Sequence, residues 1–190
     1  MRYPLFLDLA RQKVVVIGAG PVAERKIRLL LEADAAIVVV SPQATAAIRG
    51  LARRKRIRWL RRRYRAGDLR AARLVIVATD DEDLNVRICA EAKRHRLLTN
   101  CVAPPEAGNF IVPSVVRRGN LTVAISTGGA SPALAKQVRR ELEQFLHDGY
   151  AQAASKMATI RKTVSKGVKS ATKRRTIYRR ALRVWLKKTA

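Results

Sequence analysis

Short runs of apolar residues recur along the first hundred positions of the chain, and most of them contain no polar residue. Such runs are typical of strands that are buried on both faces of a parallel sheet. They predict strands at Val14–Ile17, Ala36–Val40, Ile57–Leu60, Leu74–Ala78 and Leu97–Val102. Apolar residues spaced by three or four positions predict intervening helices over about 22–33, 43–53 and 84–94. Strands that alternate with helices at this spacing indicate βαβ units with right-handed crossovers.

The pattern changes around Pro113. A strand is predicted over Leu121–Ser126, and a helix begins at Ser131-Pro132, because proline is favoured in the first turn of a helix. Residues 151–190 repeat apolar positions at helical spacing and predict two basic amphipathic helices, broken somewhere from Gly167 to Thr172. Their apolar stripes are Met157, Ile160, Val164 and Val168 in the first helix and Ile177, Ala181, Trp185 and Leu186 in the second.

These patterns predict an α/β protein with a Rossmann-type parallel sheet, followed by a small helical module. The sheet domain is expected over residues 1–113, a connecting region over 114–147 and the basic helical module over 148–190. A chain of 190 residues is long enough to bury the core that such a domain needs.

Charge is the unusual feature of the composition. Forty Lys and Arg residues against 14 Asp and Glu residues give a formal net charge of +26. A field of this sign attracts polyanions, which include nucleic acid, anionic membrane surfaces and small molecules with many carboxylates. Nine basic residues and no acidic one lie in Arg53–Arg65, and no acidic residue follows Asp148. Neither segment has the interleaved aromatic residues of a base-stacking surface, so nucleic acid is not the favoured partner.

Cysteine and histidine usage points to a reduced protein without a metal. Cys89 and Cys101 lack metal-ligand spacing, and His95 and His147 lie in polar settings where helices are predicted to end. Residues Met1–Lys13 lack the apolar core of a signal peptide, and no apolar stretch approaches the ~20 residues of a membrane span. We therefore expect a cytoplasmic protein with no membrane span and no metal site.

A glycine-rich turn joins the first predicted strand to the first predicted helix. Its pattern is Gly18-x-Gly20-x-x-Ala23, with Pro21 and Val22 opening the helix. The first glycine permits a tight turn, the second lets the backbone approach a pyrophosphate, and the alanine lets the helix pack close to the strand. The helix N-terminus then offers N–H groups to the phosphates. In this strand–turn–helix context the pattern predicts a dinucleotide-binding site.

The acidic residue that commonly binds the ribose hydroxyls of a dinucleotide is missing. It is expected at the end of the second strand, where this chain has Ser41, Pro42 and Gln43, and Asp34 lies too early because it precedes that strand. Ser41 and Gln43 either cap the next helix or contact the cofactor.

Polar residues also follow the fourth of these strands, Leu74–Ala78. Thr79 and Asp80 lie at its carboxyl end, where open α/β sheets bind ligands, and are candidates for contact with the cofactor. Asp81 and Asp83 are alternative N-caps of the next helix, and Asn85 is expected to have a structural role.

Several stretches together resemble the precorrin-2 dehydrogenase and sirohydrochlorin ferrochelatase family, which corresponds to the N-terminal region of sirohaem synthases. The similarity is collinear over about residues 3–146. It is carried by Tyr3–Phe6, Val16–Lys26, Ala78–Asp81 with Asn85, Asn109–Pro113 and Ser126–Pro132.

The resemblance implies an NAD-binding Rossmann domain, a dimerisation region over 114–147 and a helical C-terminal module, assembled as a homodimer. It implies oxidation of precorrin-2 to sirohydrochlorin with NAD⁺ as the hydride acceptor, and some members also insert Fe²⁺. A tetrapyrrole with many carboxylates fits the positive charge of the chain. The candidates for contact with it are Asn100, Thr127, Arg117, Arg118, Lys136 and Arg139.

One position departs from the family pattern. The family carries an aspartate, thought to act as a general base and in chelation, after a strand that ends in Asn-x-Val. Here Asn100-Cys101-Val102 is followed by Ala103. A lost general base typically costs ~10²–10⁴ in rate. The proton would then go to water or to Glu106, and chelatase activity is not expected.

Three hypotheses follow from this departure. The protein is an active dehydrogenase that works without that base, an impaired variant, or a non-catalytic dinucleotide- and tetrapyrrole-binding protein. A nucleic-acid-associated protein that uses its basic tail is a further and less favoured hypothesis.

Overall fold

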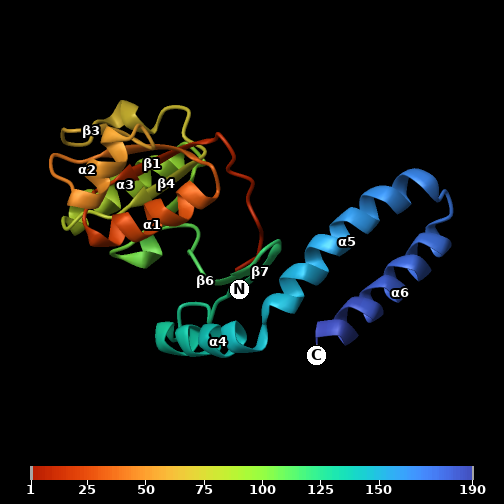
Figure 1. Cartoon of the computed structure of the whole chain (residues 1–190). Coiled ribbons are helices and arrows are strands. Elements are labelled where there is room, and N and C mark those ends of the chain that lie inside the picture. The colour runs from red at the N-terminus through yellow and green to blue at the C-terminus, as the bar shows by residue number, and fades with distance from the viewer. Residues whose placement is uncertain (1, 190) are drawn as a thin grey trace. The chain divides into compact units, whose positions relative to one another are not determined.

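The chain is described from a computed structural model, which covers residues 2–189. It divides into two compact units, Arg2–Val112 and a second unit that begins at Pro113, and each is described by itself (Figure 1). No helix within residues 2–189 combines the length and the apolar character that crossing a membrane requires.

The first unit contains a five-stranded parallel sheet, which confirms the predicted Rossmann-type architecture. Its strands are β1 (Lys13–Ile17), β2 (Ala36–Val40), β3 (Arg58–Leu60), β4 (Leu74–Val77) and β5 (Leu98–Cys101). Their order in the sheet is β3-β2-β1-β4-β5, so the strand order reverses between β1 and β4. Open α/β sheets bind ligands at the carboxyl ends of the strands at such a reversal.

Helices cover both faces of this sheet. Helices α1 (Pro21–Glu32) and α2 (Ala46–Arg53) pack on one face, and α3 (Glu82–Arg94) packs on the other. Successive side chains of a strand point to opposite faces. Along β1, Val14 and Val16 therefore join the core under α1 and α2, whereas Val15 and Ile17 join the core under α3. Burial on both faces explains why this strand is an uninterrupted apolar run.

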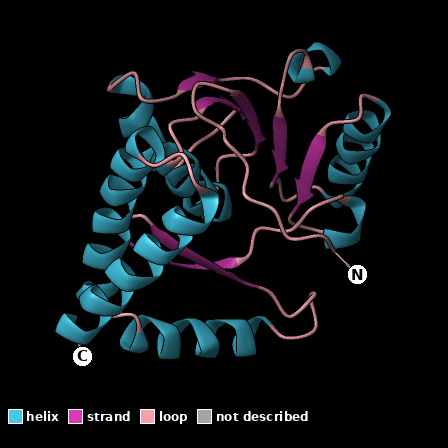
Figure 2. Cartoon of the chain, turned by 90° about the vertical axis from the view of Figure 1, so that its right-hand side faces the viewer, coloured by secondary structure: helices cyan, strands magenta, loops and turns pink. Residues whose placement is uncertain are grey.

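The second unit holds an antiparallel hairpin and three helices (Figure 2). Strands β6 (Ser114–Arg118) and β7 (Leu121–Ile125) pair, and α4 (Pro132–Phe145) packs against both. Helices α5 (Asp148–Gly167) and α6 (Ala171–Thr189) pack against each other, and the break between them falls inside the predicted interval.

Several details of the prediction are wrong. The apolar pattern interpreted above does not predict β6, although Gly119-Asn120 between two apolar runs is a hairpin signal. It also misses two short 3₁₀ helices, η1 (Ala66–Leu69) and η2 (Pro105–Ala107). In α6, Ile177 is 37% exposed, and Tyr178 takes the half-buried position in its place. The side chain of Leu186 lies outside the described residues.

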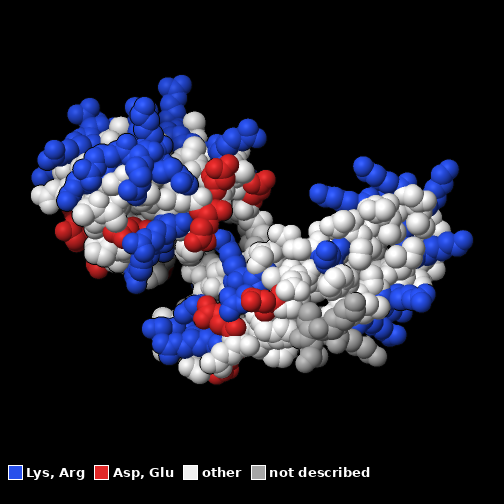
Figure 3. All heavy atoms as spheres, viewed as in Figure 1, with Lys and Arg blue, Asp and Glu red and all other residues white. Residues whose placement is uncertain are grey.

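An ion pair between Arg62 and Asp68 stabilises the segment that connects β3 to β4. Basic side chains gather over the region of α2 and β3 (Figure 3). Arg62, which follows β3, donates to both carboxylate oxygens of Asp68, at 2.8 and 2.5 Å. The backbone N–H of Arg65 donates to the same carboxylate at 2.8 Å. The Asp68 side chain is 7% exposed, and the hydrogen bonds from Arg62 hold its pKa below the ordinary value of 3.8.

Because the pKa of Asp68 is lowered on folding, its contribution to stability is present above pH 3.8 and is lost as the pH falls through the folded-state pKa. We expect Asp68→Asn to lower the free energy of unfolding by about 1–2 kcal/mol at neutral pH, with a smaller loss in acid. Urea unfolding at neutral pH and at pH 3 measures both values. An equal loss at the two pH values would contradict this assignment.

Candidate dinucleotide-binding site

Gly18 directly follows β1, at a point where the neighbouring backbone leaves no room for a side chain. Its φ is +97°, and a Cβ added to it would lie 2.2 Å from the carbonyl oxygen of Ala78, just beyond β4. The N–H of Gly18 donates to the Val40 carbonyl at 3.0 Å, and the N–H of Ala78 donates to the Ile17 carbonyl at 2.8 Å. The backbones that follow β1, β2 and β4 therefore converge at this glycine.

Gly20 lies at the N-terminus of α1 and is exposed, and here the absence of a side chain has a different effect. A Cβ added at Gly20 would meet no atom within 4 Å, so this glycine leaves open space in front of the helix. No side chain of the described residues caps α1, and Pro21 at its first position has no N–H. The N–H groups of Val22 and Ala23 have no partner within the helix and carry its positive dipole end. This arrangement fits a pyrophosphate.

The parallel sheet brings the other predicted cofactor residues to the same edge. The segment Ser41–Gln43 follows β2, and Thr79 and Asp80 follow β4. Because the strands pair in parallel register, these carboxyl ends lie beside the glycine turn. Thr79 is half-buried, whereas Pro42, Gln43 and Asp80 are exposed.

Thr45, which the sequence analysis missed, caps α2 in place of Ser41 or Gln43. Its hydroxyl accepts from the N–H of Ile48 at 3.3 Å and donates to the Glu24 carboxylate at 2.7 Å, which holds the pKa of Glu24 below its ordinary value. Its own N–H donates to the Ala19 carbonyl at 3.1 Å. Thr45 therefore fastens α2 to the glycine turn at Ala19 and to α1 at Glu24. A Thr directly before an apolar helical run is the signal that identifies such a cap.

A buried asparagine joins the loops that follow β4 and β5. Asn85 is fully buried, and its side-chain oxygen accepts from the Thr79 hydroxyl at 2.6 Å. Its amide nitrogen donates to the carbonyls of Thr79, at 3.1 Å, and Ala103, at 2.8 Å. Asn85 therefore has a structural role, because its hydrogen bonds to Thr79 and Ala103 set the spacing of the two loops. Asp81, and not Asp83, caps α3 by accepting from Leu84 at 2.8 Å.

The end of β5 carries one unpartnered polar atom. Asn100 is 7% exposed, and its amide nitrogen donates to the Phe110 carbonyl at 3.1 Å, while its side-chain oxygen is buried and without a partner among the described residues. A buried acceptor of this kind can take a hydrogen bond from a water or a ligand. Ala103 is half-buried and offers no carboxylate, and Glu106 is exposed on η2.

The other predicted substrate residues lie in the second unit. Arg118 donates to the carbonyls of Leu146 and Glu143, at 2.9 and 2.8 Å, so its guanidinium holds the end of α4. Arg139 pairs with the Glu143 carboxylate, and the Thr127 hydroxyl bridges the turn to Ser131. Two further basic residues of the set, Arg117 and Lys136, are exposed.

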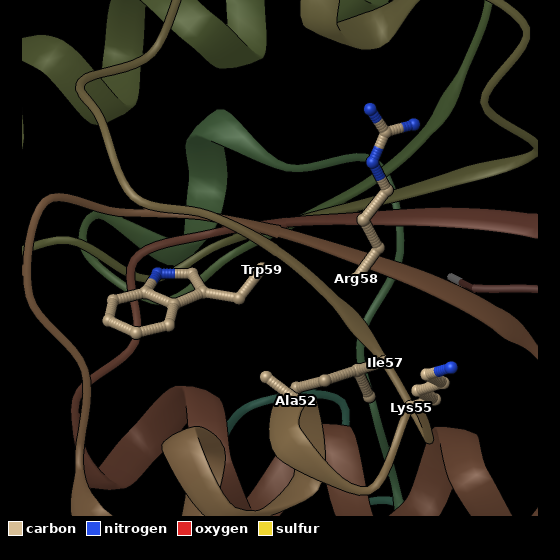
Figure 4. A pocket seen from close by; sticks show the side chains of 5 residues that line it. All are labelled: Ala52, Lys55, Ile57, Arg58 and Trp59. Carbon is tan, nitrogen blue, oxygen red and sulfur yellow. The ribbon is translucent and has the colours of Figure 1, made fainter.

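Two surface hollows lie away from the glycine turn. One, of about 440 Å³, is lined by Ala52, Lys55, Ile57, Arg58 and Trp59 (Figure 4). The other, of about 460 Å³, is lined by residues of α3 and by Tyr64. Neither of these two hollows includes a residue of the predicted cofactor set, so neither is part of the candidate site.

Metal-ligating and nucleophilic groups do not gather at this edge. Within residues 2–189 no three His, Cys, Asp or Glu residues are placed to hold a metal ion. Cys89 and Cys101 are buried free thiols, and burial raises the pKa of Cys89 to about 12. A thiol with this pKa is protonated at neutral pH and is not a nucleophile.

The fold and the glycine turn define a dinucleotide-binding protein. Residues 5–114 match the family described as putative NAD(P)-binding, and the chain belongs to this family. Residues 118–144 match the model described as sirohaem biosynthesis protein central, so the second unit carries the same family signature that the resemblance indicated.

Known proteins with this combination include siroheme synthases. The chain is 37% identical to that of Methylococcus capsulatus over 179 residues, which is 94% of this chain and 38% of the relative. It is 40% identical to that of Pseudomonas entomophila over 161 residues, which is 85% of this chain and 35% of the relative. The chain therefore spans little more than a third of these relatives.

A solved structure matches over almost its whole length. The precorrin-2 dehydrogenase SirC is 27% identical in sequence to this chain, and the two structures superpose with a TM-score of 0.78. The match covers 98% of this chain and 98% of the SirC chain. Both the nucleotide-binding unit and the helical unit are therefore part of the likeness.

The two glycines of the turn provide a matched pair of variants. Gly18→Ala is expected to lower the free energy of unfolding by about 3 kcal/mol or more, because its Cβ meets the Ala78 carbonyl. Gly20→Ala is expected to change stability by less than about 0.5 kcal/mol, because its Cβ enters open space. It should nevertheless weaken NAD⁺ binding about tenfold or more, since the methyl group blocks approach of the pyrophosphate. Urea unfolding and calorimetric titration check both, and unchanged NAD⁺ affinity in Gly20→Ala would contradict the site.

Proposed function

We propose that the chain is a precorrin-2 dehydrogenase that oxidises precorrin-2 to sirohydrochlorin with NAD⁺ as the hydride acceptor. The observation that carries the proposal is the likeness to SirC over 98% of both chains, with the dinucleotide turn intact. The match to the sirohaem biosynthesis family in the second unit supports the same pathway chemistry.

Different residues at the carboxyl edge would bind different parts of the cofactor. Gly18 shapes the turn, while Gly20 and the N-terminus of α1 would hold the pyrophosphate. The ribose on the adenine side would lie against Ser41–Gln43 and the nicotinamide side against Thr79 and Asp80. When bound, the dinucleotide supplies the oxidising power for the reaction. The protein contributes orientation, which Asn85 maintains by fixing the loop at Thr79 to the loop at Ala103.

Loss of a proton from the substrate is the step for which this chain is least equipped. Ala103 cannot accept a proton, and Glu106, the first carboxylate after β5, is exposed on η2. The proton would pass to water or to Glu106, at a cost in rate. We do not propose ferrochelatase activity, since the described residues form no group of metal ligands and lack a carboxylate at position 103.

A second candidate is a non-catalytic protein that binds a dinucleotide and a tetrapyrrole. The alanine at position 103 is the observation that favours it. The two candidates share the cofactor edge and differ only in turnover.

The substrate, assembly and location follow from the same proposal. The carboxylates of a tetrapyrrole complement the net charge of +26, and the exposed Arg117 and Lys136 are candidates to receive them. A homodimer formed through the second unit would cover Leu134 and Phe145 of α4, which are 54% and 64% exposed. The cytoplasm would keep the two thiols reduced.

Anaerobic mixing of the chain with precorrin-2 and NAD⁺ tests the proposal, with sirohydrochlorin absorbance and NADH formation as readouts. We expect turnover above the spontaneous rate, and we expect Ala103→Asp to raise it about tenfold or more by supplying a base. Ala103→Asn is the matched control, because it has nearly the same shape and cannot take the proton, and it should give no increase.

Two outcomes would count against this account. Equal rates for the Asp and Asn variants would mean that the base lies elsewhere. Absence of turnover in all three proteins, with dinucleotide binding retained, would favour the non-catalytic candidate.

A further inference from the structure

The ribose end of the dinucleotide edge has no acidic residue directly after β2. Ser41 follows β2 directly, at the position where a carboxylate commonly binds the 2′- and 3′-hydroxyls of NAD. The nearby acidic residues are occupied or displaced, since Asp68 is paired with Arg62 and Asp34 lies in the turn that precedes β2. A carboxylate at this position repels a 2′-phosphate, and its absence removes that barrier.

The neighbouring strand brings an arginine to the same place. Val40 pairs with Leu60 in the parallel register of β2 and β3, so Ser41 and Arg61 emerge side by side at the carboxyl ends of the two strands. The N–H of Ser41 donates to the Leu60 carbonyl at 3.2 Å, which continues the pairing beyond the last strand residues.

Trp59 contacts both of these residues. Its indole N–H donates to the Ser41 carbonyl at 2.9 Å, and the guanidinium carbon of Arg61 lies 6.0 Å from the centre of its ring. The indole therefore fixes the backbone of Ser41 and offers a face on which the guanidinium rests.

Arg61 differs in its contacts from Arg58 and Arg62, and its guanidinium rests over the Trp59 ring. Arg62 is committed to Asp68 by two hydrogen bonds. Arg58 points away from the Trp59 side chain, as Figure 4 shows. Arg61 is exposed and has no carboxylate partner among residues 2–189, so its five N–H donors remain available to an anion.

We infer that Ser41 and Arg61 form a binding site for the 2′-phosphate of NADP⁺, so that the chain accepts NADP⁺ in addition to NAD⁺. The inference rests on the proposed dinucleotide site and assigns its specificity. A serine hydroxyl and a planar guanidinium are the groups that bind a phosphate in place of a ribose diol. The nine basic residues of Arg53–Arg65 add a local field that favours the additional charge.

Calorimetric titration of the full chain with NAD⁺ and NADP⁺ tests this assignment. Adenosine 2′,5′-bisphosphate and adenosine 5′-monophosphate isolate the contribution of the 2′-phosphate. We expect NADP⁺ to bind at least as tightly as NAD⁺ and the bisphosphate to bind more tightly than the monophosphate. Arg61→Ala should weaken NADP⁺ and the bisphosphate about 10- to 100-fold, the range of a charge-assisted hydrogen bond, and change NAD⁺ affinity less than about twofold.

Arg58→Ala is the matched control, since it removes the same charge three residues earlier in the same basic segment, from a side chain that points away from Trp59. It should leave the ratio of NADP⁺ to NAD⁺ affinity unchanged. Ser41→Asp restores an acidic residue and should invert the preference toward NAD⁺.

Tight NAD⁺ binding with NADP⁺ at least tenfold weaker would overturn this inference and leave the proposed function intact. An equal loss of NADP⁺ affinity in Arg58→Ala and Arg61→Ala would also overturn it, because the effect would then come from the general field. Failure of both dinucleotides to bind would overturn the dinucleotide site and this inference with it. Normal binding without precorrin-2 turnover would affect only the proposed reaction.

Discussion

The carbonyl oxygen of Ala78 lies 2.2 Å from where Gly18 would carry a Cβ, and the whole cofactor edge is organised around this close approach. It brings the backbones that follow β1, β2 and β4 together, so that α1 begins directly in front of the point where the strand order reverses. The uncapped N-terminus of α1 then faces open space at Gly20. Thr45 and Asn85 hold the neighbouring segments, the first against the glycine turn and the second between the loops after β4 and β5.

The two sides of the site differ in how completely their chemistry is supplied. On the cofactor side, the glycine turn and the uncapped N-terminus of α1 both fit the pyrophosphate of a dinucleotide. On the substrate side, Ala103 lacks the carboxylate of the family pattern, and Arg118 is held by the carbonyls at the end of α4. The net positive charge therefore overstates the number of groups available to bind an anion, because arginines such as Arg62 and Arg118 form hydrogen bonds within the protein.

The sequence predicts the sheet and the turn well because both depend on local patterns. A strand covered on both faces must be apolar where it is buried, as Val14–Ile17 of β1 are, and the Gly18–Gly20 spacing reports directly on backbone shape. Some of the missed features depend on contacts between distant segments. Neither the adjacent positions of Ser41 and Arg61 after β2 and β3 nor the hydrogen bond from Asn85 to Ala103 can be inferred until the register of the sheet is known. Strand β6 is missed because its residues show neither a long apolar run nor a regular alternation of apolar and polar positions. The Gly119-Asn120 turn is the sequence signal that indicates it.

Backbone amide chemical shifts of the isotope-labelled chain during titration with NAD⁺ test the central claim most directly. If the dinucleotide binds at the carboxyl edge, the largest changes will fall on the amides of Gly18, Gly20, Val22 and Ala23, with a second group at Thr79 and Asp80. Changes confined to the hollow around Lys55 and Trp59, or no changes at saturating NAD⁺, would contradict the account.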